Sequence, residues 1–398
     1  MTRKISIILL TFLSVILCLW IWSAAAPKKA IILGGSTSVN PFMQKLTKEY
    51  YNKSEKVDFV YNSTGSQAGV GGVEKDMYTA GFISKDINDK TLTKGNNFLQ
   101  ICENSNECDF NPEVIKEIEK GEKDNSYIAL EFAIDAIGVI YNPPTYWNQK
   151  IELKENKEIT LNDLMNFDFK KEDEADKELL KKAYSGNYSW EELATELVNS
   201  HQWENNKDAY NEIINLINGQ SKTKLITFTR EDGSGTRSAF SDLTKIKDMS
   251  SSNVVNSNGS MIENMSKSPS LGYVSNGFLG QLSQSGIVKL AGFNGYKLPI
   301  GIDNDNPLEW SDQDKEWKSW ESSSSESVIN GLITDEFIKT VYDFKRPFIA
   351  IFNSYNKKLD QLIELFNFVN SNDSNEVFKS EGLVKNMKYK SLGGTSND

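Results

Sequence analysis

The residues best suited to binding chemistry lie together in residues 227–240, where Arg230 precedes Ser234, Gly235 and Thr236. The residues before Arg230 are apolar and rich in β-formers, which predicts a strand, and a helix is expected to begin near Thr236. The glycine-rich turn between them leaves backbone N–H groups free at the helix start, where the helix dipole adds partial positive charge. This segment therefore predicts an anion-binding site whose best geometric match is a tetrahedral oxyanion.

Two further turns that carry hydroxyl groups also follow expected strands. Thr37 and Ser38 come after the first strand, and Ser66 comes after the second. Alternation of strands and helices indicates an α/β fold with a mostly parallel sheet, which binds ligands at the carboxyl ends of its strands. Each turn alone is typical of an ordinary helix cap, but three such turns indicate one shared site. The expected strands are residues 30–33, 57–61, 80–84, two runs within 127–142, 224–229 and 347–352, and the expected helices around them are residues 41–51 and 357–369.

Two regions depart from the alternating pattern. Residues 168–222 are highly charged and are interpreted as a peripheral helical insertion, with helices at residues 176–183, 190–199 and 207–217. Residues 304–328 carry three tryptophans and a serine-rich run, and they are expected to form a surface loop.

Five short motifs, in this order along the chain, resemble those of the phosphate-binding proteins of bacterial high-affinity phosphate ABC transporters. The resemblance implies a two-lobed periplasmic-binding-protein fold of type II, whose lobes are joined by strands that cross near residues 133–137 and 343–347. Lobe I would comprise residues 27–135 and 344–398, and lobe II residues 136–343. The motifs are Gly35-Ser-Thr-Ser-Val-Asn-Pro41, Ser63-Thr-Gly-Ser-Gln-Ala-Gly69, Gly81-Phe-Ile-Ser-Lys85, Thr229-Arg-Glu-Asp-Gly-Ser-Gly-Thr-Arg237 and Leu271-Gly-Tyr-Val-Ser275.

The same resemblance implies a role for each candidate site residue. Arg230 corresponds to the ionic partner of phosphate, and Asp232 to the acid that holds this arginine in place. Inorganic phosphate and the permease subunits of an ABC importer are the implied partners, and a monomer without cofactor or catalytic residues is expected. The remaining ligand-binding residues implied by the motifs are Thr37, Ser38, Ser66, Ser84, Ser234, Gly235 and Thr236.

The chain departs from the family pattern at Ser84, because many members have an aspartate there that accepts the proton of hydrogen phosphate. An ionised acceptor rejects sulfate, which carries no proton, whereas a serine adds no repulsion. Discrimination between phosphate and sulfate is therefore left open. Sulfate, molybdate or a phosphonate remains an alternative ligand, and a surface adhesion or sensing protein that has kept the fold is an alternative function.

Composition and charge exclude several other classes of function. The formal net charge of −11 argues against nucleic acid as a partner. The chain has one histidine and no cluster of residues typical of a metal site. The spacing of Gly233, Ser234 and Gly235 differs from that of a hydrolase nucleophile elbow, which has glycines two residues on either side of the serine. A secreted phosphatase is thus disfavoured.

The N-terminal segment predicts a location outside the cytoplasm. Residues 5–26 carry no charge and are long enough to span a bilayer, so residues 1–26 are expected to be a signal peptide or a membrane anchor. Residues 23–26 are small, as signal peptidase requires, while Cys18 offers a lipidation site whose preceding Leu17 is larger than a lipobox prefers. Cys102 and Cys108 lie in one polar loop, and both a disulfide and two free thiols remain open.

Overall fold

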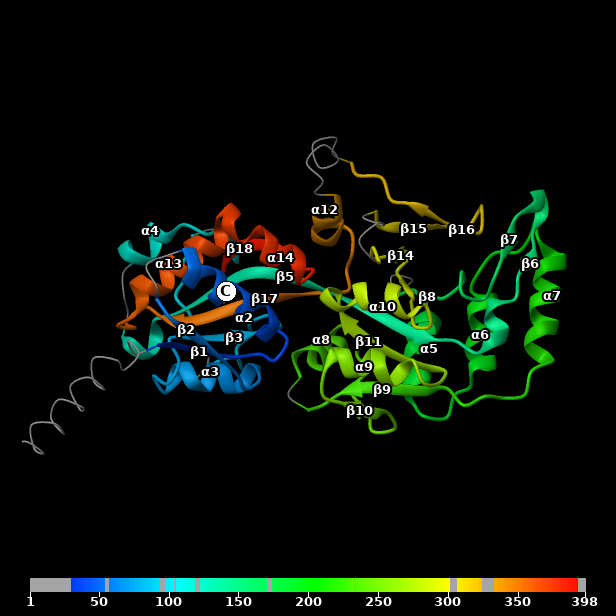
Figure 1. Ribbon diagram of the computed structural model, residues 1–398, viewed down its shortest axis with the longest axis horizontal. Coiled ribbons are helices and arrows are strands. Elements are labelled where there is room, and N and C mark those ends of the chain that lie inside the picture. The colour runs from blue at the N-terminus through cyan, green and yellow to red at the C-terminus, as the bar shows by residue number, and fades with distance from the viewer. Residues whose placement is uncertain are drawn as a thin grey trace, which may run out of the picture.

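The computed structural model describes residues 30–53, 57–93, 97–103, 105–118, 122–169, 174–232, 234–300, 306–323 and 333–392. These residues form two α/β lobes side by side, and the strands β5 (Tyr127–Asn142) and β17 (Lys345–Asn353) run from one lobe into the other (Figure 1). The predicted two-lobed α/β architecture is confirmed. The predicted signal peptide or anchor, residues 1–26, lies outside the described residues. Among the described helices, none is both long and apolar enough to cross a membrane.

The first lobe is built on three parallel strands that begin near the N-terminus. In the sheet the strand order is β2-β1-β3-β17-β5, and β17 runs antiparallel to both of its neighbours. The predictions of three strands and the first helix are confirmed, with ends shifted by at most two residues. The elements are β1 (Ile31–Gly35), α2 (Asn40–Lys53), β2 (Phe59–Ser63), α3 (Ser66–Glu74) and β3 (Ala80–Ile83).

Glycines bring the start of α3 against the ends of these strands. A Cβ atom added to Gly69 would lie 2.6 Å from Cα of Gly35, so the helix and β1 approach more closely than side chains would permit. Gly35 itself has a φ of 140°, which favours glycine, and an added Cβ would lie 2.7 Å from the backbone nitrogen of Phe82. This packing places the first turn of α3 beside the turn after β1.

The strand β5 contributes to two separate hydrophobic cores. The sequence predicts two strand-like runs here, but the structure has one strand of 16 residues. Residues 128–133 pack in the core of the first lobe, whereas residues 136–141 pack in the core of the second. The predicted lobe boundaries at residues 135/136 and 343/344 remain predictions.

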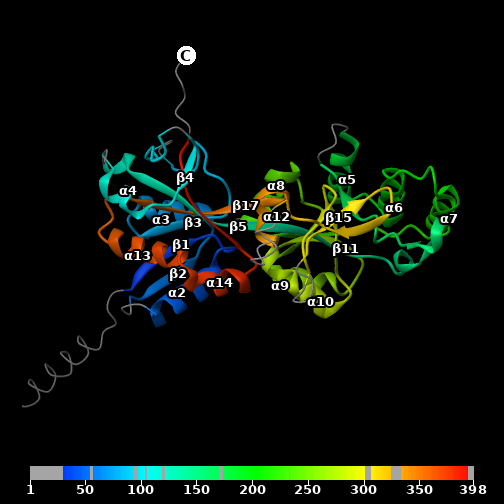
Figure 2. The ribbon, with the colours of Figure 1, turned by 90° about the horizontal axis from the view of Figure 1, so that it is seen from above.

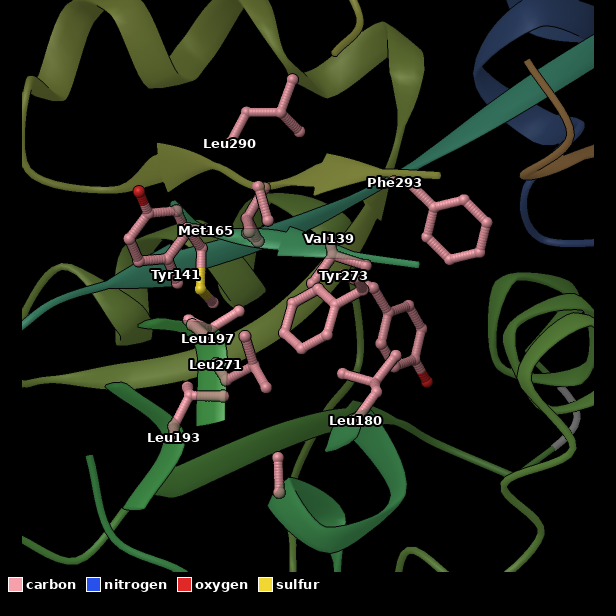
Figure 3. Close-up of a cluster of buried hydrophobic side chains, with 14 of the residues drawn as sticks. Val139, Tyr141, Met165, Leu180, Leu193, Leu197, Leu271, Tyr273, Leu290 and Phe293 are labelled. Atoms are coloured by element: carbon pink, nitrogen blue, oxygen red, sulfur yellow. The ribbon is translucent and has the colours of Figure 1, made fainter. Parts of the chain in front are cut away.

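The second lobe continues the sheet from β5 in the order β10-β9-β11-β5. β11 is antiparallel to β5, and β9 is parallel to both β10 and β11. Figure 3 shows its core, where Val139 and Tyr141 of β5 lie with Leu271 and Tyr273 of β11. The elements are β9 (Ile226–Arg230), α8 (Gly235–Thr244), β10 (Asn253–Val255), α9 (Asn258–Met265), β11 (Ser270–Ser275), α10 (Gly280–Ser285) and β12 (Lys289–Leu290).

The charged region 168–222 forms three helices of the second lobe, and the last two lie at the end of the molecule that is far from the first lobe (Figures 1 and 2). All three predicted helices are confirmed, as α5 (Glu174–Tyr184), α6 (Trp190–Asn199) and α7 (Lys207–Asn218). α6 begins with a capping box, in which the side chain of Ser189 accepts from the backbone of Glu192. Apolar residues of all three helices nevertheless belong to the core of the second lobe. This region is therefore an integral layer of that lobe.

The tryptophan-rich region differs from its prediction as a surface loop. Its described part forms a hairpin of β15 (Leu308–Ser311) and β16 (Glu316–Ser319), in which Trp310 pairs with Trp317. Their ring centroids lie 5.3 Å apart, and such cross-strand aromatic pairs stabilise sheets. The prediction was wrong because the many polar residues around the tryptophans are typical of a loop, although they belong to two short strands in which polar and apolar residues alternate.

The remaining elements complete the two lobes. Cys102 and Cys108 form a disulfide, which resolves the alternative that the sequence left open. Cys108 lies on β4, which pairs with the last strand, β18. The predicted C-terminal strand and helix are confirmed as β17 and α13. The other elements are β4 (Glu107–Asp109), α4 (Pro112–Glu117), β6 (Ile151–Glu152), β7 (Glu158–Ile159), β8 (Asn166–Phe167), β13 (Gly292–Phe293), β14 (Tyr296–Lys297), α12 (Ile333–Thr340), α13 (Leu359–Asn370), α14 (Asn375–Ser380) and β18 (Val384–Lys390).

Candidate functional site

A cluster of hydroxyl groups lies where the strands of the first lobe end. Ser36 follows β1 and Ser84 follows β3, and their oxygens lie 2.8 Å apart in a fully buried contact. Because β1 and β3 are parallel neighbours, their carboxyl ends meet at the same edge of the sheet. The backbone N–H of Ser38 donates to Oγ of Ser36 at 3.2 Å. The structure therefore brings the predicted residues Ser38 and Ser84 together through Ser36, which the sequence analysis did not assign to the site.

The start of α8 brings the second lobe onto this cluster. Ser234 caps the helix, and the buried residues Gly235 and Thr236 form its first turn. Oγ1 of Thr236 lies 3.0 Å from Oγ of Ser38, in a contact between the two lobes. A Cβ atom added to Gly235 would overlap Oγ of Ser84, so only glycine permits this approach. The lobes are thus closed upon one another at the predicted residues.

Two predicted site residues have buried hydroxyl groups without a hydrogen-bond partner in the described part of the chain. These are Oγ1 of Thr37, in the turn after β1, and Oγ of Ser66, the first residue of α3. Leaving a buried polar group unsatisfied costs about 1–3 kcal/mol, so such groups call for an explanation. Thr37 lies between Ser36 and Ser38, and the backbone N–H of Gly65, just before Ser66, donates to the carbonyl of Gly35 at 2.8 Å, so both hydroxyl groups belong to the edge of the first lobe where β1 ends.

Arg230 lies at the end of β9, and its buried side chain is held within the second lobe. Its Nε and Nη2 donate to the two carboxylate oxygens of Glu231 at 2.9 and 3.0 Å. Nη1 donates to Asn258 at 3.0 Å, and Nη2 also donates to the backbone carbonyl of Asn256 at 3.2 Å. Four of the five N–H groups of this guanidinium therefore have partners in the protein.

The acid that holds Arg230 differs from the one that the sequence predicts. Asp232 forms an ion pair with Arg237 at 2.8 Å, and its side chain is 94% exposed. Glu231 takes the predicted role because it directly follows the strand, whereas Asp232 lies on the surface of the turn. The resemblance alone could not distinguish these two adjacent carboxylates.

A second buried guanidinium at the site was missed by the sequence analysis. Nε and Nη2 of Arg346 donate to Oδ2 of Asp135 at 2.9 and 2.7 Å, and Ser275 donates to Oδ1 of Asp135 at 2.6 Å. Nη2 of Arg346 also donates to Oγ1 of Thr236 at 3.1 Å. Burial lowers the pKa of Arg346, and the charge of Asp135 opposes that shift.

The signal that could have identified this pair is a charged residue within an apolar strand. Asp135 interrupts the run of apolar residues in β5, and Arg346 lies near the start of the apolar strand β17. Charged side chains are seldom fully buried unless they are paired. Each residue therefore indicated a charged partner, although no pattern along the chain identified which one.

A family model for the periplasmic-binding-protein (PBP) superfamily domain matches residues 23–372. This range covers most of the chain, including both lobes and the strands that join them. No curated protein sequence matches the chain.

Three solved structures illustrate the likeness at low sequence identity. A phosphate transport receptor of the ABC type from Vibrio cholerae is 18% identical, with 89% of this chain and 99% of that chain covered and a TM-score of 0.48. A putative phosphate ABC transporter substrate-binding protein with bound phosphate, from Clostridium perfringens, is 17% identical, with coverage of 90% and 100% and a TM-score of 0.49. PstS from Borrelia burgdorferi is 18% identical, with coverage of 90% and 99% and a TM-score of 0.43.

Proposed function

Because the chain belongs to the PBP superfamily, we propose that it is an extracytoplasmic solute-binding protein that captures inorganic phosphate and delivers it to an ABC importer. The observation that carries this proposal is the meeting of hydroxyl groups and a helix start from two lobes at one buried place. Such a site binds its ligand by closure of the lobes and performs no catalysis. The ligand-binding residues in this proposal are Ser36, Thr37, Ser38, Ser66, Ser84, Ser234, Gly235 and Thr236.

The charges at the site favour recognition by hydrogen bonds rather than by net positive charge. Each of the two buried guanidinium groups is paired with a carboxylate, Arg230 with Glu231 and Arg346 with Asp135. A buried dianion is costly unless many donors surround it. Hydroxyl groups and helix N–H groups supply those donors, and each charge-assisted hydrogen bond contributes roughly 1.5–3 kcal/mol. A tetrahedral oxyanion, with acceptor oxygens in four directions, fits donors that arrive from both lobes.

Ligand entry requires the two lobes to separate. The oxygens of Ser38 and Thr236 lie 3.0 Å apart, so they satisfy one another directly. One phosphate oxygen that accepted from both would hold them up to about 5 Å apart, given two hydrogen bonds of about 2.7 Å. We infer that the lobes move about β5 and β17 and that the anion replaces this contact on closure.

The N-terminal segment and the partners complete the proposal. Residues 1–26 would export the protein or anchor it to the membrane, so that it works outside the cytoplasm as a monomer that meets permease subunits. The net charge of −11 is compatible with this role, because the ligand is selected by local donors.

Another oxyanion is the second candidate ligand, and a specific observation favours it. Ser84 offers a hydroxyl group, already in contact with Ser36, where an ionised acceptor would reject sulfate. Calorimetric titration of the full chain in mild detergent, first with phosphate and then with sulfate, tests both ligands. Tight binding of one phosphate with no sulfate signal supports the proposal, whereas binding of both supports a broader oxyanion carrier. Binding of neither would refute the transport function.

A further inference from the structure

We propose that Arg346, rather than Arg230, supplies the guanidinium that contacts the bound oxyanion, with its unpartnered Nη1 as the donor. This inference rests on the proposed function, since it names a specificity-determining residue of the same site. It differs from the sequence-based expectation, in which Arg230 is the ionic partner.

The two arginines differ in how many of their N–H groups remain without a partner in the described part of the chain. Within the described part of the chain, Arg230 has one N–H group left, because Glu231, Asn258 and Asn256 accept the others. Arg346 is 3% exposed, and its Nη1 has no hydrogen-bond partner among the described residues. Nη1 carries two N–H groups, so Arg346 has two N–H donors that could bind a ligand.

The position of Arg346 connects this donor to the hydroxyl cluster. Nη2 of the same guanidinium donates to Oγ1 of Thr236, which in turn contacts Oγ of Ser38. The guanidinium therefore lies at one end of a chain of polar contacts that passes between the lobes. An anion that displaced the contact between Ser38 and Thr236 would come within reach of Arg346.

Asp135 fixes the guanidinium at the junction of the two lobes. Arg346 lies on β17 and Asp135 on β5, and the two residues are paired in register across these strands. Two hydrogen bonds from Arg346 and one from Ser275 hold the carboxylate and the guanidinium in one orientation. Since β5 and β17 join the lobes, we expect this cation to keep its contact with Asp135 when the lobes open.

A purely structural ion pair is the competing explanation for Asp135 and Arg346. Buried ion pairs stabilise a fold only when their remaining donors are satisfied, because desolvation of both charges is costly. Here the two N–H groups of Nη1 are buried without a protein partner in the described residues, which disfavours a purely structural role. A bound oxyanion would satisfy them with charge-assisted hydrogen bonds.

The test is calorimetric titration of inorganic phosphate into the full chain, with variants at both arginines. Arg346→Lys keeps a positive charge beside Asp135 but removes the two N–H donors of Nη1. We expect it to weaken phosphate binding by more than about tenfold. Arg230→Gln is the comparison variant, and we expect it to lose clearly less phosphate affinity than Arg346→Lys. The reverse pattern, in which only Arg230→Gln loses phosphate, would overturn the assignment.

A neutral double variant separates ligand contact from support of the fold. Asp135→Asn with Arg346→Gln removes both buried charges and leaves no unpaired ion. We expect cooperative thermal unfolding by circular dichroism together with phosphate binding that remains weakened by more than about tenfold. Recovery of full affinity in this variant would overturn the assignment, since Arg346 would then act only through Asp135. If the unaltered chain binds neither phosphate nor sulfate, the proposed function fails as well, which is a distinguishable result.

Discussion

The substitution Gly235→Ala adds one methyl group where the start of α8 meets Ser84 of the first lobe. We predict that this methyl group weakens closure of the lobes. The new Cβ atom would overlap Oγ of Ser84 and lie 3.0 Å from Oγ of Ser36 and 3.1 Å from Cβ of Ser84. Ser84 is fully buried and bonded to Ser36, so it cannot turn aside without losing that contact. Overpacking of this kind costs about 1–3 kcal/mol.

The penalty falls on the closed form alone, because Gly235 and Ser84 belong to different lobes. A closed form destabilised by about 1–3 kcal/mol corresponds to a loss of about 5- to 150-fold in ligand affinity. We expect the upper part of this range, since the overlapping atom is held by a hydrogen bond. The thermal stability of the ligand-free chain should change little, because the open form avoids the overlap.

Calorimetric titration with phosphate measures this loss, and two comparisons identify its cause. Gly259→Ala is the matched control, because Gly259 is also in the first turn of a helix and its added Cβ would lie no closer than 4.0 Å to Oγ of Ser257. Combining Gly235→Ala with Ser84→Ala removes the overlapping oxygen but keeps the contacts at 3.0 and 3.1 Å, so the double variant should recover most of the lost phosphate affinity relative to Ser84→Ala alone. Unchanged affinity in Gly235→Ala would refute closure at this contact.

Three further predictions concern the site, the disulfide and a partly buried lysine. Thr236→Val removes a hydroxyl that contacts Ser38 and Arg346 and should weaken phosphate binding by about tenfold, whereas Thr244→Val at the other end of α8 should leave calorimetric affinity unchanged. Replacing Cys102 and Cys108 by alanine should lower the free energy of unfolding in urea by about 2 kcal/mol, from loop entropy, and a loss of phosphate affinity would contradict a purely stabilising role for the disulfide. Burial lowers the pKa of Lys297 to about 8, so the unfolded chain binds more protons between pH 8 and about 10.5 and stability should rise across this window. Lys297→Met should flatten that rise. It should also stabilise the fold by about 2 kcal/mol at pH 7, which is less than the full pKa shift corresponds to because the side chain is partly exposed. An unchanged pH profile of the melting temperature would exclude this explanation.

Local patterns in the sequence were sufficient to predict most of the elements and the hydroxyl-bearing turns. The turn after β1 and the start of α8 could be identified because turns of glycine, serine and threonine follow several strands in turn, although each turn alone is typical of a helix cap. The contact between Ser38 and Thr236 follows only once the lobes close, since these residues are 198 positions apart.

The buried ion pair could not be predicted from local patterns. Asp135 and Arg346 are 211 residues apart, and their pairing depends on the register between β5 and β17. The tryptophan hairpin was missed for a related reason. Its polar flanking residues predict a loop, but the cross-strand contact of Trp310 with Trp317 stabilises two strands there. In both cases the stabilising contact depends on which strands pair and in which register. The residue pattern of a single segment does not contain that information.

A crystal structure of the full chain with bound phosphate would test the central claim most directly. We predict one phosphate between the lobes, in contact with Thr236 of α8, Ser38 of the first lobe and Nη1 of Arg346. Phosphate bound away from the contact between Ser38 and Thr236, or no phosphate at saturating concentration, would contradict it.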